Sequence, residues 1–307
     1  MVDGITRAGK FLLGSVISAF EGLEFIQYSL AFETMLILHR LGKMDLDTLR
    51  ALSHLEMDSM AFNMAIGRSL NGRQVDLSCI NRAPDAASFL ARAAVEDREE
   101  LVRRFKEERR LPLHICHEGL PSAPVIFELF PKVRLVSILR DPAALAMSWF
   151  KRGWGRRSGA NDGQVFSLFF TAPGEPRPWW ALDWQEDYAQ LSEMERCVLS
   201  IAALQNEARR GFEAAGGAAS GRVCFVRYDT LVEKPDAVLA TMAGFLGRKP
   251  GPALSVIMTQ QRLPGALPAG QRMKHLEAIA GLISPRYRPV LEQACAEYDG
   301  YWKDLSV

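Results

Sequence analysis

Short apolar runs alternate with longer amphipathic segments along the chain. Five runs rich in Val, Ile, Leu and Phe, each bounded by turn residues, predict β-strands at residues 2–6, 23–27, 113–116, 133–139 and 223–228. These runs are nearly continuous in apolar character, which is typical of parallel strands that helices cover on both faces. The pattern therefore predicts an α/β fold with a central parallel sheet of about five strands and helices on both faces.

The segments between the strands have helical periodicity. Helices are expected at residues 10–20, 30–41, 45–69, 85–109, 142–151, 185–213, 231–246 and 285–305. Residues 98–110 mix charges of both signs at i, i+4 spacing, which indicates a solvated helix face. The Pro- and Gly-rich residues 249–270 are expected to be irregular surface chain. We predict a single α/β domain over residues 1–307.

Composition and charge narrow the classes of protein. Of the 307 residues, 48% are hydrophobic and 24% are charged, which excludes a disordered, collagen-like or coiled-coil chain. A formal charge of +1 gives no overall field toward nucleic acid or an anionic membrane, so any anion must be bound locally. Five widely spaced cysteines without a C-x-x-C pair disfavour a disulfide framework and favour the reducing cytoplasm.

The N-terminal region imitates a signal peptide. Arg7 and Lys10 precede an apolar run at residues 11–20, but Asp3 and the lack of a small-residue cleavage site argue against secretion. No stretch reaches 18 uncharged apolar residues. We therefore expect a cytoplasmic protein without stable membrane insertion.

A glycine-rich turn connects the first strand to the first helix. Residues 4–11 match the phosphate-loop spacing G-x-x-x-x-G-K, but Phe11 stands where Ser or Thr normally holds magnesium. Backbone N–H groups at a helix N-terminus bind phosphate or sulfate without a metal. The alternative is an ordinary turn. The candidate anion-binding residues are Gly4, Thr6, Arg7, Ala8, Gly9, Lys10 and Phe11.

A second block lies at residues 133–149. Arg140 ends a buried strand at the edge where parallel sheets bind ligands, and Ser148 lies two turns along the following helix. The alternative partner for Arg140 is an acid such as Asp141.

Together these blocks resemble the sulfotransferases that use 3′-phosphoadenosine 5′-phosphosulfate. The resemblance implies that residues 6–9 hold the 5′-phosphosulfate and that Arg140 and Ser148 hold the 3′-phosphate. Residues 223–235 resemble the family's next strand and the start of its helix, with Tyr228 either lining the adenosine pocket or packing in the core. Residues 271–274, which include Arg272, stand where the family places a second basic loop on the 3′-phosphate.

The phosphate loop departs from the family's pattern. The family's loop has hydroxyl residues at the positions of Ala8, Lys10 and Phe11, so hydroxyls that could bind phosphate oxygens are missing. Lys10 either supplies charge in their place or points to solvent. With Phe11 in the metal-ligand position, we expect that no metal is required.

The strand at residues 113–116 leads to a candidate base. His117 matches the catalytic histidine of the resemblance, and a neutral imidazole there can accept the proton of an acceptor hydroxyl. Glu118 is the alternative base. Two further readings are a histidine that only caps the strand and a metal site at His114, Cys116 and His117.

An aromatic segment follows at residues 149–184, with Lys151, Arg152, Arg156 and Arg157 among its basic residues. It is either a lid whose rings stack on an acceptor or a packing element between helices or chains. The acceptor is expected to be a small molecule or carbohydrate with a hydroxyl or amine group. A homodimer is left open, and no nucleic-acid partner is expected.

Two other functions compete with sulfonate transfer. A magnesium-dependent kinase or nucleotide hydrolase would use Asp141 near the metal, but Phe11 argues against it. A nucleotide-binding module without catalysis is the other rival, because Ala8 and Phe11 depart from the catalytic pattern.

Overall fold

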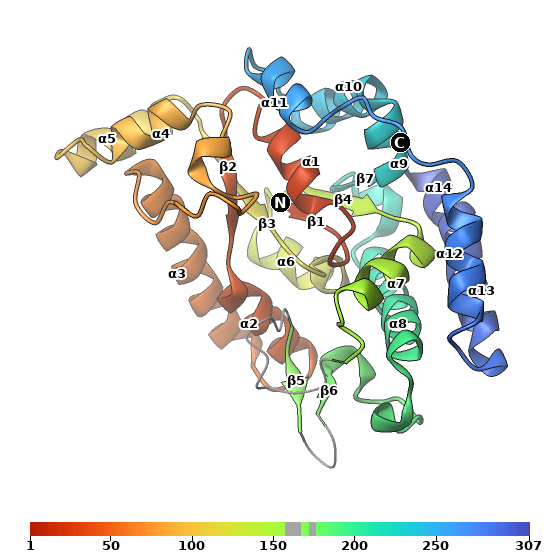
Figure 1. Cartoon of the computed structure of the whole chain (residues 1–307). Helices are drawn as coiled ribbons and strands as arrows, with labels where there is room; N and C mark the ends of the chain where they lie inside the picture. The colour runs from red at the N-terminus through yellow and green to blue at the C-terminus, as the bar shows by residue number, and fades with distance from the viewer. Residues whose placement is uncertain (157–166, 172–175) are drawn as a thin grey trace.

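A five-stranded parallel sheet forms the centre of the molecule. The computed structural model describes residues 1–156, 167–171 and 176–307. The strand order is β2-β3-β1-β4-β7, formed by β1 (Val2–Asp3), β2 (Leu23–Tyr28), β3 (Leu111–Ile115), β4 (Leu135–Leu139) and β7 (Val223–Arg227) (Figure 1). All five predicted strands are present, and the predicted fold class is confirmed. The first strand is shorter than predicted because the chain turns at Gly4.

Two helical layers bury the sheet, because successive strand residues point to opposite faces. Val136 and Ile138 of β4 pack in the layer of α1 (Lys10–Ile17), α9 (Tyr228–Glu233), α10 (Pro235–Leu246) and α11 (Leu254–Gln260). Leu135 packs in the opposite layer, which contains α2 (Leu30–Arg40), α3 (Leu46–Ala65), α6 (Ala123–Leu129), α14 (Tyr301–Leu305) and the C-terminal part of α8 (Glu193–Ala214). The expectation of helices on both faces is met (Figure 1).

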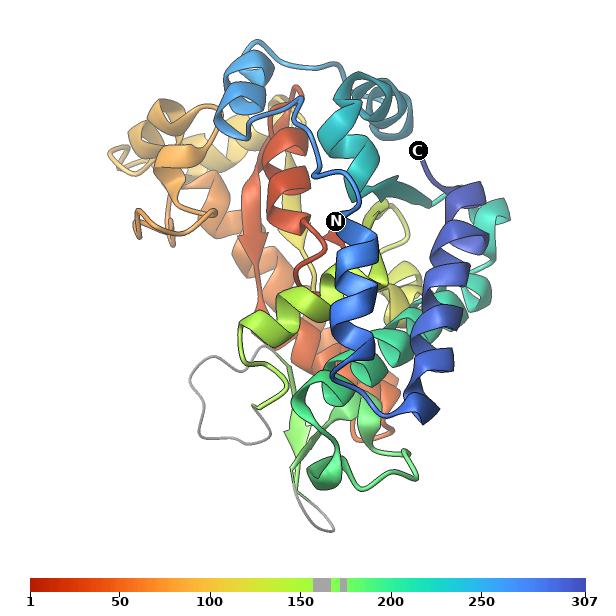
Figure 2. The ribbon, with the colours of Figure 1, turned by 45° about the vertical axis from the view of Figure 1, so that its right-hand side comes forward.

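A group of helices packs beside the carboxyl edge of the sheet. Helix α7 (Pro142–Lys151) follows β4 and contacts α8, α12 (Gln271–Ala280) and α13 (Arg288–Asp299), and Figure 2 shows this group from the side. Within the predicted aromatic segment, β5 (Phe169–Phe170) and β6 (Arg177–Pro178) form a short antiparallel pair. Residues 157–166, which include Arg157, and residues 172–175 lie outside the described residues.

Several helix boundaries differ from the predictions for local reasons. The predicted helix at residues 85–109 is divided into α4 (Ala86–Arg92) and α5 (Arg98–Glu107), because the Asp97 side chain caps a new helix at the amide of Glu100 (3.0 Å). The predicted helix at residues 231–246 is divided at Pro235, which starts α10. Helix α8 begins only after Ser192, where Ser192 and Glu195 form a capping box.

Three further helices were not predicted as such. Helix α11 lies inside the segment that was expected to be irregular, and α6 and α12 lie where no helix was expected. Arg272 therefore belongs to the first turn of α12 and not to a basic loop. The predicted helix at residues 285–305 is a 3₁₀ turn followed by α13 and α14, which are separated at Gly300.

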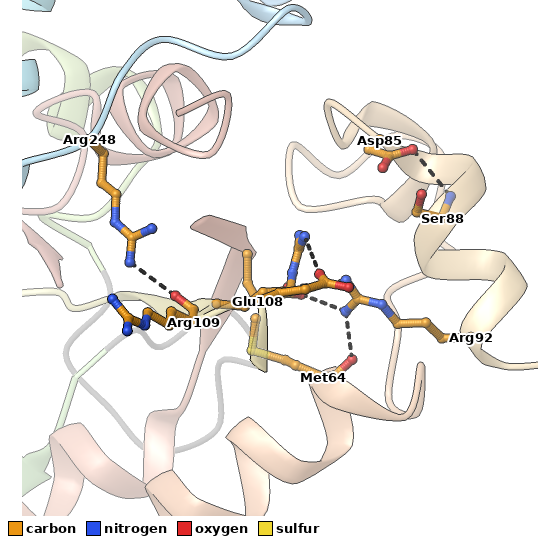
Figure 3. Close-up of polar contacts among 9 residues, drawn as sticks. Met64, Asp85, Ser88, Arg92, Glu108, Arg109 and Arg248 are labelled. Carbon is orange, nitrogen blue, oxygen red and sulfur yellow. Dashed lines mark hydrogen bonds and ion pairs between the residues drawn. The ribbon is translucent and has the colours of Figure 1, made fainter. Parts of the chain in front are cut away.

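Ion pairs close the opposite, amino edge of the sheet. Arg92 and Arg110 both bind the fully buried carboxylate of Glu24 at the start of β2. Arg92 also donates to the carbonyl oxygen of Met64 (3.3 Å), and Arg248 donates to that of Arg109 (3.0 Å), as Figure 3 shows. These contacts fix α4 and α5 to the sheet. The predicted solvated face holds along α5, whereas Arg110 turns inward.

Among the described helices, none combines the length and the apolar character needed to cross a membrane.

Candidate active site

The turn after β1 has the backbone shape of an anion-binding loop. Gly4 and Gly9 have φ values of +150° and +115°. A Cβ atom on Gly4 would lie 2.6 Å from the carbonyl oxygen of Ile138, and one on Gly9 would lie 2.8 Å from the Tyr228 ring. Both positions therefore require glycine. Helix α1 starts directly after Gly9, so its free N–H groups and the positive end of its dipole face the loop.

Lys10 is buried beneath this loop. Only 3% of the residue is exposed, and its Nζ donates to the carbonyl oxygen of Gly4 (2.6 Å). Burial lowers the pKa of this ammonium, while the nearby carboxylates of Glu33, Asp3 and Glu118 raise it. The alternative that Lys10 points to solvent is therefore wrong. The side chain lies inside the loop, where it can supply charge.

Neighbouring elements brace the other loop residues. The indole N–H of Trp149 in α7 donates to the carbonyl oxygen of Thr6 (2.8 Å), and the Thr6 hydroxyl faces Glu118 (3.5 Å). Ala8 is buried in the core. The ring of Phe11 lies 6.2 Å from the ring of His117, so Phe11 lines the region around the candidate base.

Three guanidinium groups gather beside the loop. Arg140 donates to the carbonyl oxygen of Arg7 (2.9 Å) and lies over the ring of Tyr228 at 4.4 Å. Burial, together with the like charges of Arg152 and Arg140, lowers the pKa of Arg7. Like charges held this closely create a strong local attraction for an anion. Arg152 was expected only as part of the aromatic segment, as a lid or a packing element. It is the C-cap residue of α7, four residues after Ser148, and this spacing is the signal that could have assigned it to this site.

The alternative partner of Arg140, Asp141, makes other contacts. Asp141 instead caps α7 at the amide of Ala144 (2.9 Å) and pairs with Arg272 (3.1 Å). Arg272 also pairs with Asp299 of α13 (2.7 Å). The guanidinium of Arg140 therefore contacts the carbonyl oxygen of Arg7 and the ring of Tyr228.

A hollow of about 270 Å³ opens between these groups. Arg140, Ala144, Tyr228, Arg272 and His275 are among the residues that line it. Ser148 lies one helical turn beyond Ala144 on the same side of α7. The structure thus brings the predicted residues Arg140, Tyr228 and Arg272 together around one cavity next to the loop.

His117 follows β3 and faces a carboxylate from another element. Its backbone N–H donates to Oε1 of Glu33, and its Nδ1 lies 3.2 Å from the same oxygen. Burial, and then the charge of Lys10, lowers the pKa of His117 well below its usual range. The imidazole is therefore neutral near pH 7, the state in which it can accept a proton. Its ring nitrogen contacts Glu33 of α2, and this contact fits both a catalytic base and a histidine that only caps the strand.

Sequence reasoning missed Glu33. This residue lies in the first turn of α2, directly after β2, and only 5% of it is exposed. Burial raises the pKa of its carboxyl group to about 8. A single carboxylate within the apolar residues 30–36, five positions after a strand, is the signal that could have found it.

Glu118 takes a strained backbone conformation with a φ of +69°. Burial raises the pKa of its carboxyl group to about 8, and the nearby charges of Glu33 and Asp3 act in the same direction. Glu118 lines an enclosed cavity together with Asp3, Gly4 and Gln205. The two candidate bases therefore occupy different surroundings: His117 lies beside aromatic rings, and Glu118 lies beneath the loop.

The alternative of a metal site at residues 114–117 is not supported. The ring of His114 is buried and packs against Phe32 of α2 at 5.5 Å. Within the described ranges, no three His, Cys, Asp or Glu side chains come together as metal ligands.

The described tryptophans of the aromatic segment are largely packing residues. Trp149, Trp179 and Trp180 are at most 8% exposed and pack edge to face or at a tilt against one another. The guanidinium of Arg40 lies 5.8 Å from the Trp179 ring. These rings pack beside the loop after β1, which agrees with the alternative that the segment is a packing element.

Comparisons with known proteins agree with this architecture. A family model described as a sulfotransferase domain matches residues 48–261, which include His117, Arg140, Ser148 and Tyr228 but not the phosphate loop. A search of curated proteins found no match.

Three solved structures of low similarity are sulfotransferases. The sulfotransferase domain from the curacin biosynthetic pathway is 14% identical (TM-score 0.45), with 100% of this chain and 90% of that chain covered. The sulfotransferase domain of the Synechococcus PCC 7002 olefin synthase is 15% identical (TM-score 0.47), with 97% and 93% covered. A Mycobacterium avium sulfotransferase is 14% identical (TM-score 0.40), with 95% and 75% covered.

Proposed function

Because the chain belongs to the sulfotransferase family, we propose that it transfers a sulfonate group from 3′-phosphoadenosine 5′-phosphosulfate to an acceptor hydroxyl or amine. Members of this family generally use that donor. The observation that most supports it here is the gathering of Arg7, Arg140 and Arg152 around a glycine-shaped loop. Such a cluster fits a ligand with anionic groups at both of its ends.

The donor would lie along the carboxyl edge of the sheet. Residues 4–11 fit its 5′-phosphosulfate, because Gly4 and Gly9 leave the backbone N–H groups unobstructed at the start of α1. Arg140 and Ser148 fit its 3′-phosphate, with Arg272 at the rim of the same hollow and Tyr228 beside the nucleoside. When bound, the donor supplies an activated sulfonate and an anionic leaving group.

Fixed positive charge at the loop would stabilise that leaving group. Arg7 is exposed at the turn, whereas Lys10 is buried and its Nζ donates to the carbonyl oxygen of Gly4. Charges held in place before the reaction need little reorganisation as negative charge develops. Lys10 thereby takes over part of the task of the missing loop hydroxyls.

His117 would accept the proton of the acceptor group as that group attacks sulfur. Burial keeps the imidazole neutral, and the rings of Phe11 and Tyr28 lie 6.2 Å and 4.7 Å from it. Glu118 is the second candidate, but it lies beneath the loop and its strained backbone fixes it there. The aromatic surroundings favour His117.

We propose that the reaction needs no divalent metal. Phe11 stands where a phosphate-loop kinase has the hydroxyl that binds magnesium, and Asp141 is already used as a helix cap and in an ion pair with Arg272. Both features disfavour the kinase or nucleotide hydrolase. The acceptor is a small molecule or carbohydrate, and residues 1–307 act as a single domain in the cytoplasm.

Two measurements test this function together. Isothermal titration calorimetry should show tighter binding of adenosine 3′,5′-bisphosphate than of ATP with magnesium. Transfer of radioactive sulfonate from the donor to a panel of phenols, alcohols, amines and sugars should follow. Preference for ATP with magnesium would establish the kinase alternative. Binding of the bisphosphate without transfer to any acceptor would favour a module without catalysis.

A further inference from the structure

The buried carboxylate of Glu33 contacts the candidate base at two points. Its Oε1 accepts the backbone N–H of His117 and lies 3.2 Å from Nδ1 of the same residue. Its Oε2 accepts a hydrogen bond from the hydroxyl of Tyr28 (3.3 Å). The ring of Tyr28 in turn stands edge-on to the imidazole, at 4.7 Å and 89°. The imidazole is thus held by a carboxylate at Nδ1 and by a T-shaped contact with the Tyr28 ring.

From this geometry we propose that Glu33 is a positioning residue that keeps the proton of His117 on Nδ1 and leaves Nε2 free to accept the proton of the acceptor. This inference rests on the proposed function for its catalytic meaning. Nε2 lies across the imidazole ring from Nδ1 and therefore points away from Glu33. The acceptor would approach on that side.

The direction of the Nδ1 hydrogen bond follows from the backbone contact. Oε1 receives the N–H of His117, so Oε1 must be a hydrogen-bond acceptor. In an ionised carboxylate both oxygens accept. In a protonated carboxyl group the carbonyl oxygen is the stronger acceptor, and we assign it to Oε1 because Oε1 already accepts the backbone N–H while the hydroxyl of Tyr28 faces Oε2. In either state the group facing Nδ1 is an acceptor, and Nδ1 must donate. The tautomer of His117 therefore does not depend on whether Glu33 is charged.

Several titratable groups surround this pair. Lys10 of α1 and Cys116 and Glu118 of the loop after β3 lie close to Glu33. Tyr28 faces it from the end of β2, and Asp3 faces Lys10 and Cys116. Because these groups also titrate, a pH profile alone would not identify the role of Glu33, and the test needs a direct view of the imidazole protons.

Nuclear magnetic resonance of protein labelled with ¹⁵N-histidine gives that view. Long-range ¹H–¹⁵N spectra distinguish a protonated from an unprotonated ring nitrogen, and the His117→Gln variant assigns the signal among the five histidines. In the wild-type chain we expect Nδ1 protonated and Nε2 unprotonated. Free imidazoles generally favour the other tautomer, so this result would identify an acceptor at Nδ1. An Nε2-protonated ring in the wild type would overturn the inference without any variant.

Two substitutions separate positioning from other roles. Glu33→Gln keeps an oxygen at the Oε1 position, so the tautomer should persist and kcat should fall by no more than about tenfold. Glu33→Ala removes the acceptor, so the Nε2-protonated form should appear and kcat should fall by about 10²-fold, within the range for loss of general-base catalysis. The KM for the donor should change little in both variants.

Glu56→Gln is the matched control. Glu56 is a partly buried carboxylate on α3 that accepts the hydroxyl of Ser29, one residue before α2, and its hydrogen bond does not involve His117. Removing the charge of Glu56 should leave the tautomer of His117 unchanged and kcat within a few fold of wild type. If Glu33→Gln abolishes turnover as completely as Glu33→Ala, Glu33 acts through its own proton and the positioning role is wrong. An unchanged tautomer in Glu33→Ala would also refute it.

Failure of this inference can be told apart from failure of the proposed function. The tautomer is read in the absence of donor and acceptor, so it decides the role of Glu33 even if no sulfonate transfer is found. Sulfonate transfer by a chain whose His117 carries its proton on Nε2 would refute the inference alone.

Discussion

Replacing Glu33 by glutamine should change how the stability of the fold depends on pH. The carboxyl group is buried, and burial raises its pKa from 4.5 to about 8 in the folded chain. Between these values the folded state holds a proton that the unfolded state has released. Stability from this group is therefore fully present below about pH 4.5 and is lost as pH rises through the folded pKa near 8.

The size of the effect follows from the linkage between protonation and folding. One proton difference changes the free energy of unfolding by about 1.4 kcal/mol per pH unit. From about pH 6 to about pH 8 the wild-type chain should therefore lose about 2 kcal/mol of stability through Glu33 alone. Glutamine has the shape of the protonated acid and does not titrate. The free energy of unfolding of Glu33→Gln relative to wild type should rise by this amount over the same interval.

Urea denaturation monitored by tryptophan fluorescence at the two pH values measures this difference. Because the other titrating groups are present in both proteins, their contributions largely cancel. Glu118 is the exception, since its pKa is raised partly by the charge of Glu33, and removing that charge should increase the difference. Burial of neutral His117 changes the pH dependence of stability in the opposite direction, because its lowered pKa makes the chain less stable in acid. A constant difference between the two proteins across this interval would refute the burial argument.

Three further outcomes are expected. Arg140→Ala should weaken binding of adenosine 3′,5′-bisphosphate by about 1.5–3 kcal/mol in calorimetry, because it removes a charged group proposed to bind the 3′-phosphate; unchanged affinity would exclude that role. His117→Ala should lower the rate of sulfonate transfer by roughly 10²–10⁴-fold and leave bisphosphate affinity within a few fold. A larger loss of rate in Glu118→Gln would identify Glu118 as the base instead. A chelator should leave turnover nearly unchanged, and a strict magnesium requirement would favour the kinase alternative.

The sheet could be predicted from sequence because each strand carries its own signal. A parallel strand buried on both faces must be apolar along its length, and the five apolar runs became the five strands. Helix breaks were harder to predict. Asp97 and Pro235 start new helices inside patterns of continuous helical periodicity, because capping depends on one side chain and leaves the periodicity unchanged.

The candidate site was predicted where residues lie close in sequence to the strand ends. Arg140 and Tyr228 each come directly after or at the end of a strand, and the structure brings both to the same hollow. Glu33 and Arg152 reach the site from within α2 and from the end of α7. Their inclusion depends on how those helices pack against the sheet, and the packing arises from contacts across the whole chain. The spacing of residues along the sequence therefore does not predict that Glu33 and Arg152 reach the site.

The two loops that form the site hold each other in strained shapes. Arg7 and Glu118 are non-glycine residues with φ values of +77° and +69°, a conformation that costs about 1–3 kcal/mol each. Such strain persists only where surrounding contacts determine the backbone. Here the amide of Gly119 donates to the buried carboxylate of Asp3, and Trp149 and Lys10 hold the carbonyl groups of Thr6 and Gly4.

These contacts link the loop after β1 to the loop after β3 and to α7. Arg7 belongs to the loop proposed to bind the donor, and Glu118 is the neighbour of the proposed base. If the two loops moved independently, the distance between donor and base would vary, and the advantage of fixed geometry would be lost. Strain at both residues therefore indicates a site whose two halves are folded as one unit, with the stability of the surrounding core maintaining the distance between them.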